Sequence, residues 1–113
     1  MRPKEFAKYL ARDLYCPHCG RDEGLIPQHR ANRGMGGSKA RHTPSNIIVL
    51  CAIYNGLIES DARYADDARR YGYKLLSHES STYQPIYDAC VDRWFRIDDE
   101  FGREWVDWDS EIE

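Results

Sequence analysis

Two short apolar runs, separated by a basic loop with three glycines, most constrain how this chain can fold. The first run covers residues 25–29 and ends on His29, and the second covers residues 47–50 and is rich in β-branched side chains. Such runs are typical of strands. In the segment that follows, residues 52–71, apolar side chains recur at helical spacing, and a glycine provides a stop. This order predicts strand, loop, strand and helix.

The segments on either side of this unit predict further elements of an α+β fold. Residues 3–14 carry an apolar stripe at helical spacing, which predicts a short packing helix. Residues 85–87 and 93–97 have the composition of two strands of a C-terminal β-hairpin. Residues 98–113 are acidic and contain two tryptophans. Their sequence is compatible with a frayed tail, a docked helix or an oligomer contact.

Length and composition fit one small domain over residues 1–113. We place its core at about residues 16–72 and a C-terminal extension at about residues 73–113. The sequence has no run of about 18 apolar residues, and its first residues lack the apolar region of a signal peptide. We therefore expect no membrane association and a cytoplasmic protein, in the host cytoplasm if a phage encodes it. Thiols stay reduced in that compartment.

The net charge of −3 is unevenly distributed along the chain. Residues 1–50 hold 9 basic against 4 acidic side chains, whereas residues 51–113 hold 7 against 15. The basic half contains the glycine loop, which favours local contact with phosphates. A disordered basic loop is the alternative. The residues predicted to bind nucleic acid are Arg30, Arg33, Lys39 and Arg41.

The cysteines predict either a metal site or packed thiols rather than disulfides. Cys16 and Cys19 stand two residues apart in the sequence CPHCG, a turn that presents both thiolates to one zinc ion. Cys51 would be a third ligand, and Tyr54 occupies the place of a fourth. The choice stays open between Zn²⁺ with another fourth ligand, for which His18 is a candidate, and a metal-free knuckle. Cys90 stands far along the chain and is expected to be a buried thiol.

These motifs together resemble the HNH endonuclease family, in particular small phage-type members with an RGMGG loop. The resemblance rests on CxxC, then QHRxxRGMGG, then SNIIVLC, then NGxIES, and it covers residues 16–72. The later GYKL, PIYD and RWFxID motifs also look like such proteins, less specifically. The resemblance implies a ββα-metal (His-Me finger) core with a cysteine knuckle.

The family assigns a role to each matching position. His29 occupies the place of the general base, whose ordinary pKa near neutrality suits proton transfer from water. Asn46 occupies the place of a residue that fixes the loop through hydrogen bonds to the backbone. Asn55 replaces a family histidine and would hold a catalytic Mg²⁺ or Mn²⁺ ion through its side-chain oxygen. Gln28 stands where many members have a charged or imidazole metal ligand, and Glu59 is a candidate for the missing charge.

The resemblance implies metal-dependent hydrolysis of DNA phosphodiester bonds. Its partners would be DNA and phage packaging or recombination proteins, with the oligomeric state left open. Because Gln28 is neutral, a first alternative is a catalytically weak or inactive HNH-fold module that binds DNA or a protein. A second alternative is a zinc-stabilised module whose acidic tail mimics DNA.

Overall fold

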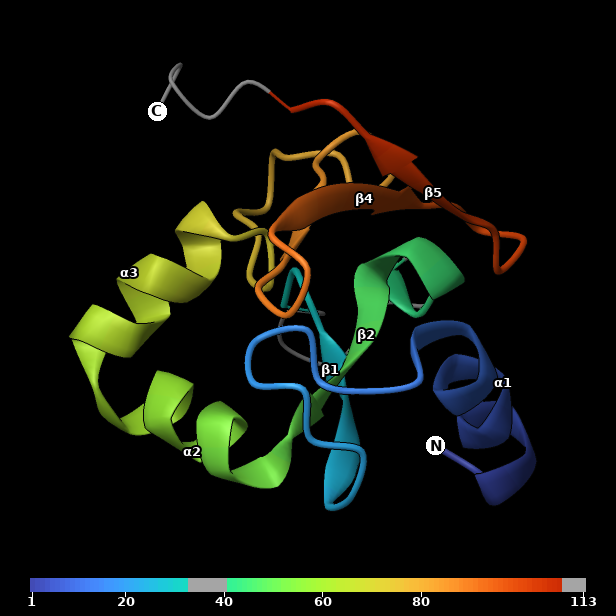
Figure 1. Cartoon of the computed structure of the whole chain (residues 1–113), viewed down its shortest axis with the longest axis horizontal. Helices are drawn as coiled ribbons and strands as arrows, with labels where there is room; N and C mark the ends of the chain where they lie inside the picture. Colours follow the sequence, from blue (N-terminus) through green and yellow to red (C-terminus); the bar gives the residue numbers. More distant parts are fainter. Residues whose placement is uncertain (33–40, 109–113) are drawn as a thin grey trace.

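The computed structural model describes residues 1–32 and 41–108, which form a small α+β unit with two antiparallel sheets (Figure 1). Within these residues, every helix is too short or too polar to cross a membrane. The elements, in chain order, are α1 (Pro3–Asp13), β1 (Leu25–His29), a 3₁₀ turn (Pro44–Asn46), β2 (Ile47–Cys51), α2 (Ala52–Ser60), α3 (Ala62–Arg70), β3 (Ile86–Asp88), β4 (Arg93–Ile97) and β5 (Arg103–Val106).

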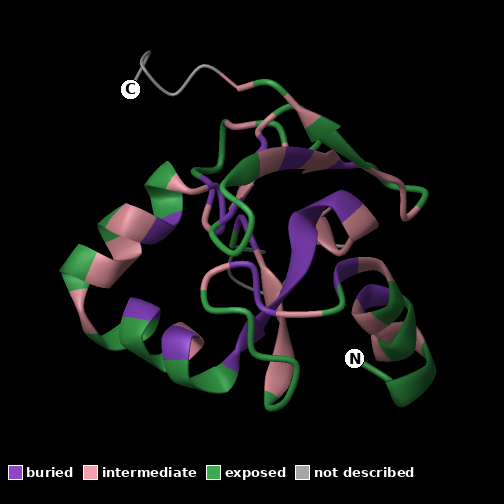
Figure 2. Cartoon of the chain, in the orientation of Figure 1, coloured by how far each residue is buried: buried purple, intermediate pink, exposed green. Residues whose placement is uncertain are grey.

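The β1–β2 pair lies at the centre of the molecule and follows the predicted strands. The two strands are antiparallel, with Leu25 opposite Cys51 and His29 opposite Ile47. All five residues of β2 are buried, and Figure 2 shows this strand as a continuous buried ribbon. Because successive side chains alternate between the faces of a strand, β2 serves two hydrophobic clusters.

Each face of β2 packs against a different helix. Ile48 and Leu50 belong to a cluster with Tyr54 and Ile58 of α2. On the other face, Ile47 and Val49 pack with Tyr9 of α1, together with Phe6 and Leu10. The predicted N-terminal helix is confirmed, and its apolar stripe covers this second face.

The single helix predicted over residues 52–71 is two helices. Asp61 interrupts it with an extended backbone (φ −138°, ψ 119°), and its side chain accepts a hydrogen bond from the backbone N–H of Arg63. An aspartate that caps the next helix in this way competes with helix continuation. The break turns α3 back toward the second sheet (Figure 1).

The predicted C-terminal hairpin is confirmed as β3–β4, and it gains a third strand. β5 pairs antiparallel with β4, giving the order β3–β4–β5. The turn before β5 is built on Asp98, whose Oδ1 accepts hydrogen bonds from the backbone N–H groups of Glu100 and Gly102, each at 2.8 Å. Part of the acidic segment is therefore a strand, and residues 109–113 lie outside the described residues.

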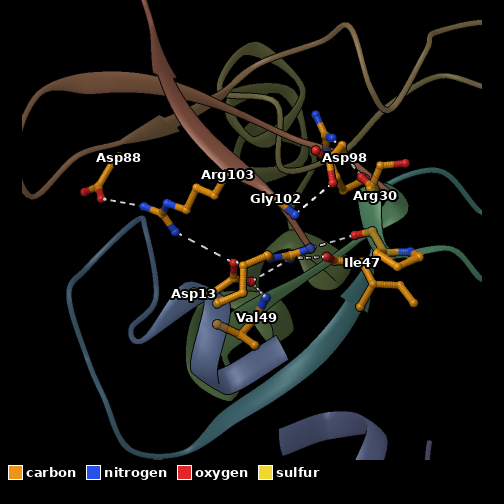
Figure 3. Close-up of polar contacts among 11 residues, drawn as sticks. Asp13, Arg30, Ile47, Val49, Asp88, Asp98, Gly102 and Arg103 are labelled. Carbon is orange, nitrogen blue, oxygen red and sulfur yellow. Dashed lines mark hydrogen bonds and ion pairs between the residues drawn. The ribbon is translucent and has the colours of Figure 1, made fainter. Parts of the chain in front are cut away.

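A network of buried charges joins α1 to both sheets (Figure 3). The Asp13 carboxylate accepts hydrogen bonds from Arg12 at 2.6 Å and from the backbone N–H of Val49 at 3.1 Å. Arg103 of β5 lies 3.7 Å from Asp13 and 3.5 Å from the fully buried Asp88 of β3. Paired charges are the form in which ionic groups tolerate burial. The network fixes α1, which carries a residue of the candidate site.

Candidate functional site

His29 is the last residue of β1 and lies in a chain of hydrogen-bonded side chains. Its Nε2 lies 3.1 Å from Nδ1 of His42, and Nε2 of His42 lies 2.7 Å from a carboxylate oxygen of Glu5 in α1. All three side chains are half-buried. His42 and Glu5 were not predicted as site residues, because they stand 13 and 24 positions from His29, and only the packing of α1 brings them together.

The carboxylate sets the protonation pattern along this chain. A carboxylate only accepts hydrogen bonds, so Nε2 of His42 carries the proton that points to Glu5. When both rings are neutral, Nδ1 of His42 is then an acceptor, and His29 donates to it from Nε2. This tautomer, assigned from the hydrogen-bond pattern, leaves Nδ1 of His29 unprotonated. The arrangement orients an imidazole and offers a carboxylate to stabilise the positive charge that proton uptake creates.

Gln28 and His29 lie on opposite faces of the β1–β2 pair. Gln28 is opposite Ile48, which packs toward α2, whereas His29 is opposite Ile47, which packs toward α1. Residues directly opposite each other in an antiparallel pair share a face. Gln28 is therefore on the side of α2, and His29 on the side of α1.

Asn55, in the first turn of α2, has a side-chain oxygen without a partner. Its Oδ1 is buried and makes no hydrogen bond within the described residues. Leaving a buried acceptor unsatisfied costs about 1–3 kcal/mol. A divalent cation would satisfy this oxygen, since hard cations take amide oxygens as ligands. Glu59 lies one turn further along α2 and is exposed, and its charge acts on Lys74.

Asn46 joins the two ends of the glycine loop, near residues 31 and 41, a region that we call the neck of the loop. This is the role that the family resemblance implies for Asn46. Its Oδ1 accepts a hydrogen bond from the backbone N–H of Ala31 at 2.9 Å. Its Nδ2 donates to the carbonyl oxygens of Ala31 at 3.0 Å and Arg41 at 2.8 Å. The side chain is 3 % exposed. Asn46 thus holds both ends of the loop.

The prediction that Arg30 binds phosphate is wrong, because this side chain is fully buried. Burial lowers its pKa to about 9, so it keeps its charge at neutral pH. Its guanidinium donates hydrogen bonds of 2.8–3.0 Å to four backbone carbonyls, those of Ser45, Gly72, Ser81 and Gln84. Each of its three nitrogens thus donates to a backbone carbonyl, so this buried arginine holds four segments of the chain together.

Of the other predicted phosphate ligands, the structure places only Arg41. Arg33 and Lys39 lie outside the described residues. The Arg41 guanidinium donates to the carbonyl oxygens of Asn32 at 2.8 Å and Ser77 at 3.1 Å. It lines a cavity of about 380 Å³ together with Arg69 and Lys74. The cavity gathers three cationic side chains beside the neck of the loop, and none of the described residues that line it is acidic.

The knuckle brings three cysteines together. The sulfur atoms of Cys16, Cys19 and Cys51 all lie within 4.8 Å of one another, a group that could hold a metal ion. Burial raises the pKa of the Cys16 thiol to about 12, so this thiol keeps its proton unless a metal ion replaces it. His18, the other candidate ligand, does not belong to the group. Cys90 is exposed, contrary to the predicted buried thiol.

Comparisons with family models, with curated proteins and with solved structures found no match to this chain.

Proposed function

We propose that this chain is a metal-dependent endonuclease of the HNH type, whose ββα-metal core consists of β1, β2 and α2. The observation that carries the proposal is the hydrogen-bonded chain from His29 through His42 to Glu5. An imidazole oriented by a second group that is itself oriented by a carboxylate is an arrangement suited to general-base catalysis. The half-buried position of these side chains at a strand end, beside a basic loop, suits a phosphodiester substrate.

In this proposal His29 accepts a proton from the attacking water. The imidazolium that forms is stabilised through His42 by the negative charge of Glu5, and the same contacts hold the ring during the transfer. When bound, a Mg²⁺ or Mn²⁺ ion would polarise the scissile phosphate and stabilise the leaving 3′ oxygen. Asn55 would hold that ion through Oδ1, with Gln28 on the same side of the β1–β2 pair and Glu59 as the nearest carboxylate of α2.

The separation of His29 from Asn55 counts against the nuclease proposal, which requires the base and the cation to meet at one phosphate. The base lies on the α1 side of the β1–β2 pair, and the proposed cation ligands lie on the α2 side. In a displacement at phosphorus, the attacking and leaving oxygens lie roughly in line on opposite sides. Both oxygens belong to one phosphate, whereas the β1–β2 pair lies between the base and the proposed cation ligands, so this placement favours the inactive binding module.

Substrate phosphates would be held by the cavity that Arg41, Arg69 and Lys74 line. Burial lowers the pKa of Lys74, while the charge of Glu59 raises it. An anionic ligand in this cavity would favour the charged lysine. Such contacts are insensitive to base sequence, so this domain alone would show little sequence preference.

Plasmid cleavage tests the proposal. Supercoiled DNA is incubated with the protein in Mg²⁺, in Mn²⁺ and in EDTA, and relaxed and linear products are counted. We expect cleavage with either metal and none in EDTA. His29→Ala should reduce the rate by roughly 10²- to 10⁴-fold, the usual contribution of a general base. The matched control is His78→Ala, because His78 is exposed and takes no part in the hydrogen bonds among His29, His42 and Glu5, and it should cleave like the wild type.

A catalytically inactive module that binds DNA is the second candidate, and Gln28 favours it. A neutral amide at this position binds a hard divalent cation more weakly than a carboxylate does. If the wild type leaves plasmid supercoiled in both metals, the nuclease proposal is abandoned. DNA retention that falls steeply with salt would then support the binding module, because phosphate contacts release counterions.

A further inference from the structure

The cysteine group has the dimensions of a zinc site but supplies only three ligands. The sulfur atoms of Cys19 and Cys51 lie 3.6 Å apart. In a tetrahedral site with Zn–S bonds of about 2.3 Å, neighbouring sulfur atoms are about 3.8 Å apart. The Cys51 sulfur also accepts a hydrogen bond from the backbone N–H of Tyr54 at 3.3 Å, which orients it. Structural zinc sites almost always have four ligands, so one ligand must come from elsewhere.

The two candidate ligands nearest to the cysteines in the sequence, His18 and Tyr54, are packed in an aromatic cluster. The rings of His18 and Tyr54 are stacked, with centroids 3.6 Å apart and planes 6° from parallel. The ring of Tyr73 meets both at right angles, at 6.3 Å from His18 and 5.9 Å from Tyr54. Turning either stacked ring toward the sulfur atoms would break this aromatic cluster.

A fourth cysteine lies beside the knuckle, although it is 39 positions from Cys51 in the sequence. The turn between β3 and β4 is tied to the knuckle by a hydrogen bond of 2.8 Å from the backbone N–H of Ala89 to the carbonyl of Pro17. This places Cys90 against Gly20, where a Cβ added to the glycine would lie 2.9 Å from the Cys90 sulfur. Gly20 follows Cys19 directly, and the Cys90 and Cys19 thiols interact electrostatically.

We infer that Cys90 is the fourth ligand of a structural zinc site, with Cys16, Cys19 and Cys51 as the other three. The Cys90 sulfur is not among the sulfur atoms that lie within 4.8 Å of one another. Binding therefore needs a rotation of the Cys90 side chain, which its exposed position permits. The ligand that the sequence lacks at position 54 is supplied from the second sheet.

The zinc site would join three separate parts of the chain. The knuckle precedes β1, Cys51 ends β2, and Cys90 lies between β3 and β4. One ion would thus link the knuckle, the central strand pair and the C-terminal sheet. This inference is independent of the proposed nuclease activity, since it concerns the assembly of the fold.

Thiol alkylation of the wild-type protein tests the inference directly. The reduced protein is treated with iodoacetamide with and without one equivalent of Zn²⁺, and each cysteine is followed by peptide mass spectrometry. We expect zinc to protect all four cysteines and a content of one zinc ion per chain. Equal alkylation of Cys90 in both samples, or a protein that binds no zinc, would overturn the inference.

Substitution gives an independent measurement. Cys90→Ser should weaken zinc binding, which is measured by competition with a chromophoric chelator. Loss of a residue that only contacts a metal ligand weakens metal binding roughly tenfold to hundredfold, so loss of a ligand should weaken it at least as much. In the Co²⁺-loaded protein, the variant should lose part of the thiolate-to-metal absorption. The matched control is Val91→Ser, since Val91 is its exposed neighbour. Cys90→Ser with wild-type zinc affinity and Co²⁺ spectrum would refute the assignment.

Discussion

Buried polar side chains are hydrogen-bonded at the neck of the glycine loop, whereas some at the first turn of α2 have no hydrogen-bond partner. At the neck, Arg30 and Asn46 make hydrogen bonds of 2.7–3.0 Å to the backbone of several segments. At the first turn of α2 and the knuckle beside it, three buried side-chain atoms have no partner. They are the only such atoms among the described residues: Nδ1 of His18, Oη of Tyr54 and Oδ1 of Asn55.

The difference indicates which parts of the site the polypeptide completes by itself. A buried polar network is stable when every member is satisfied and costly when one is not. The neck is complete, so it can hold the neighbouring His29 in position without any ligand. The first turn of α2 is incomplete, which is the condition expected where a ligand or ion binds. Changes at the neck should therefore destabilise the fold, and changes at α2 should affect ligand binding.

The largest expected effect is the loss of Arg30. Arg30→Met removes the donors of four backbone carbonyls, and each buried acceptor left unsatisfied costs about 1–3 kcal/mol. We expect the free energy of unfolding to fall by roughly 3 kcal/mol or more, measured by urea denaturation. Arg41→Met, at a half-buried arginine, should cost about 1 kcal/mol or less. Similar losses for the two variants would mean that the neck is not held together by Arg30.

The two asparagines give the sharpest comparison. Asn46→Leu removes three hydrogen bonds from the neck, so the free energy of unfolding should fall by about 2 kcal/mol or more. Asn55→Leu replaces an oxygen without a partner, so the metal-free protein should be unchanged or more stable by up to about 1 kcal/mol.

Added Mn²⁺ separates the two asparagines further. It should raise the melting temperature of the wild type and of Asn46→Leu but not that of Asn55→Leu, because ligand binding stabilises only a protein that keeps its site. Equal destabilisation by both leucine variants would show that Asn55 is an ordinary packed residue.

Glu5→Gln tests the hydrogen-bonded chain at its far end. The amide keeps the shape of the side chain but cannot supply the negative charge that stabilises a protonated His29. We expect a fall in the cleavage rate of about tenfold, equivalent to about 1.4 kcal/mol, with stability nearly unchanged. The control is Glu100→Gln, at an exposed acidic residue. A wild-type rate for Glu5→Gln would remove the carboxylate from the mechanism.

The smallest expected effect is at the basic cavity. Arg69→Gln should weaken DNA binding a few-fold and lower the slope of affinity against salt by about one unit, as expected for one lost phosphate contact. Fluorescence anisotropy at several salt concentrations measures both. Arg63→Gln is the matched control on the same helix, since Arg63 pairs with Asp61 as Arg69 pairs with Asp66, but Arg63 does not line the cavity. Equal slopes for the two variants would mean that phosphates bind elsewhere.

Local patterns predicted the local elements. The apolar periodicity of residues 3–14 and 52–71, the β-branched run before Cys51 and the aromatic strands of the hairpin each depend on neighbouring residues, so a sequence reveals them. The break at Asp61 had a local signal, an aspartate that can cap a helix. The strand β5 had little local sequence signal, because it is four residues long and lies in an acidic segment.

Features that depend on distant contacts were beyond sequence reasoning. Nothing near Arg30 distinguishes it from the other arginines of a basic loop, because the carbonyls that bury it come from residues 45, 72, 81 and 84. The pairing of Glu5 with His42 depends on how α1 packs, and the position of Cys90 depends on the β3–β4 turn. Sequence spacing identified Cys16, Cys19 and Cys51 as a group, because the knuckle is local and a strand pair brings Cys51 to it.

The carbonyl contacts of Arg30 determine where this protein can be cut. Shortening the chain to residues 1–72, the apparent core, would remove two of the four carbonyl oxygens that accept hydrogen bonds from Arg30. The buried guanidinium would then lack half of its partners in the fragment. Expression of that fragment should yield aggregated material. A fragment that ends after residue 84 keeps every acceptor but still loses Ile86, Phe95 and Ile97, which are buried in the main hydrophobic cluster. The minimal folding unit therefore includes part of the C-terminal extension, residues 73–113, and cannot end at residue 72.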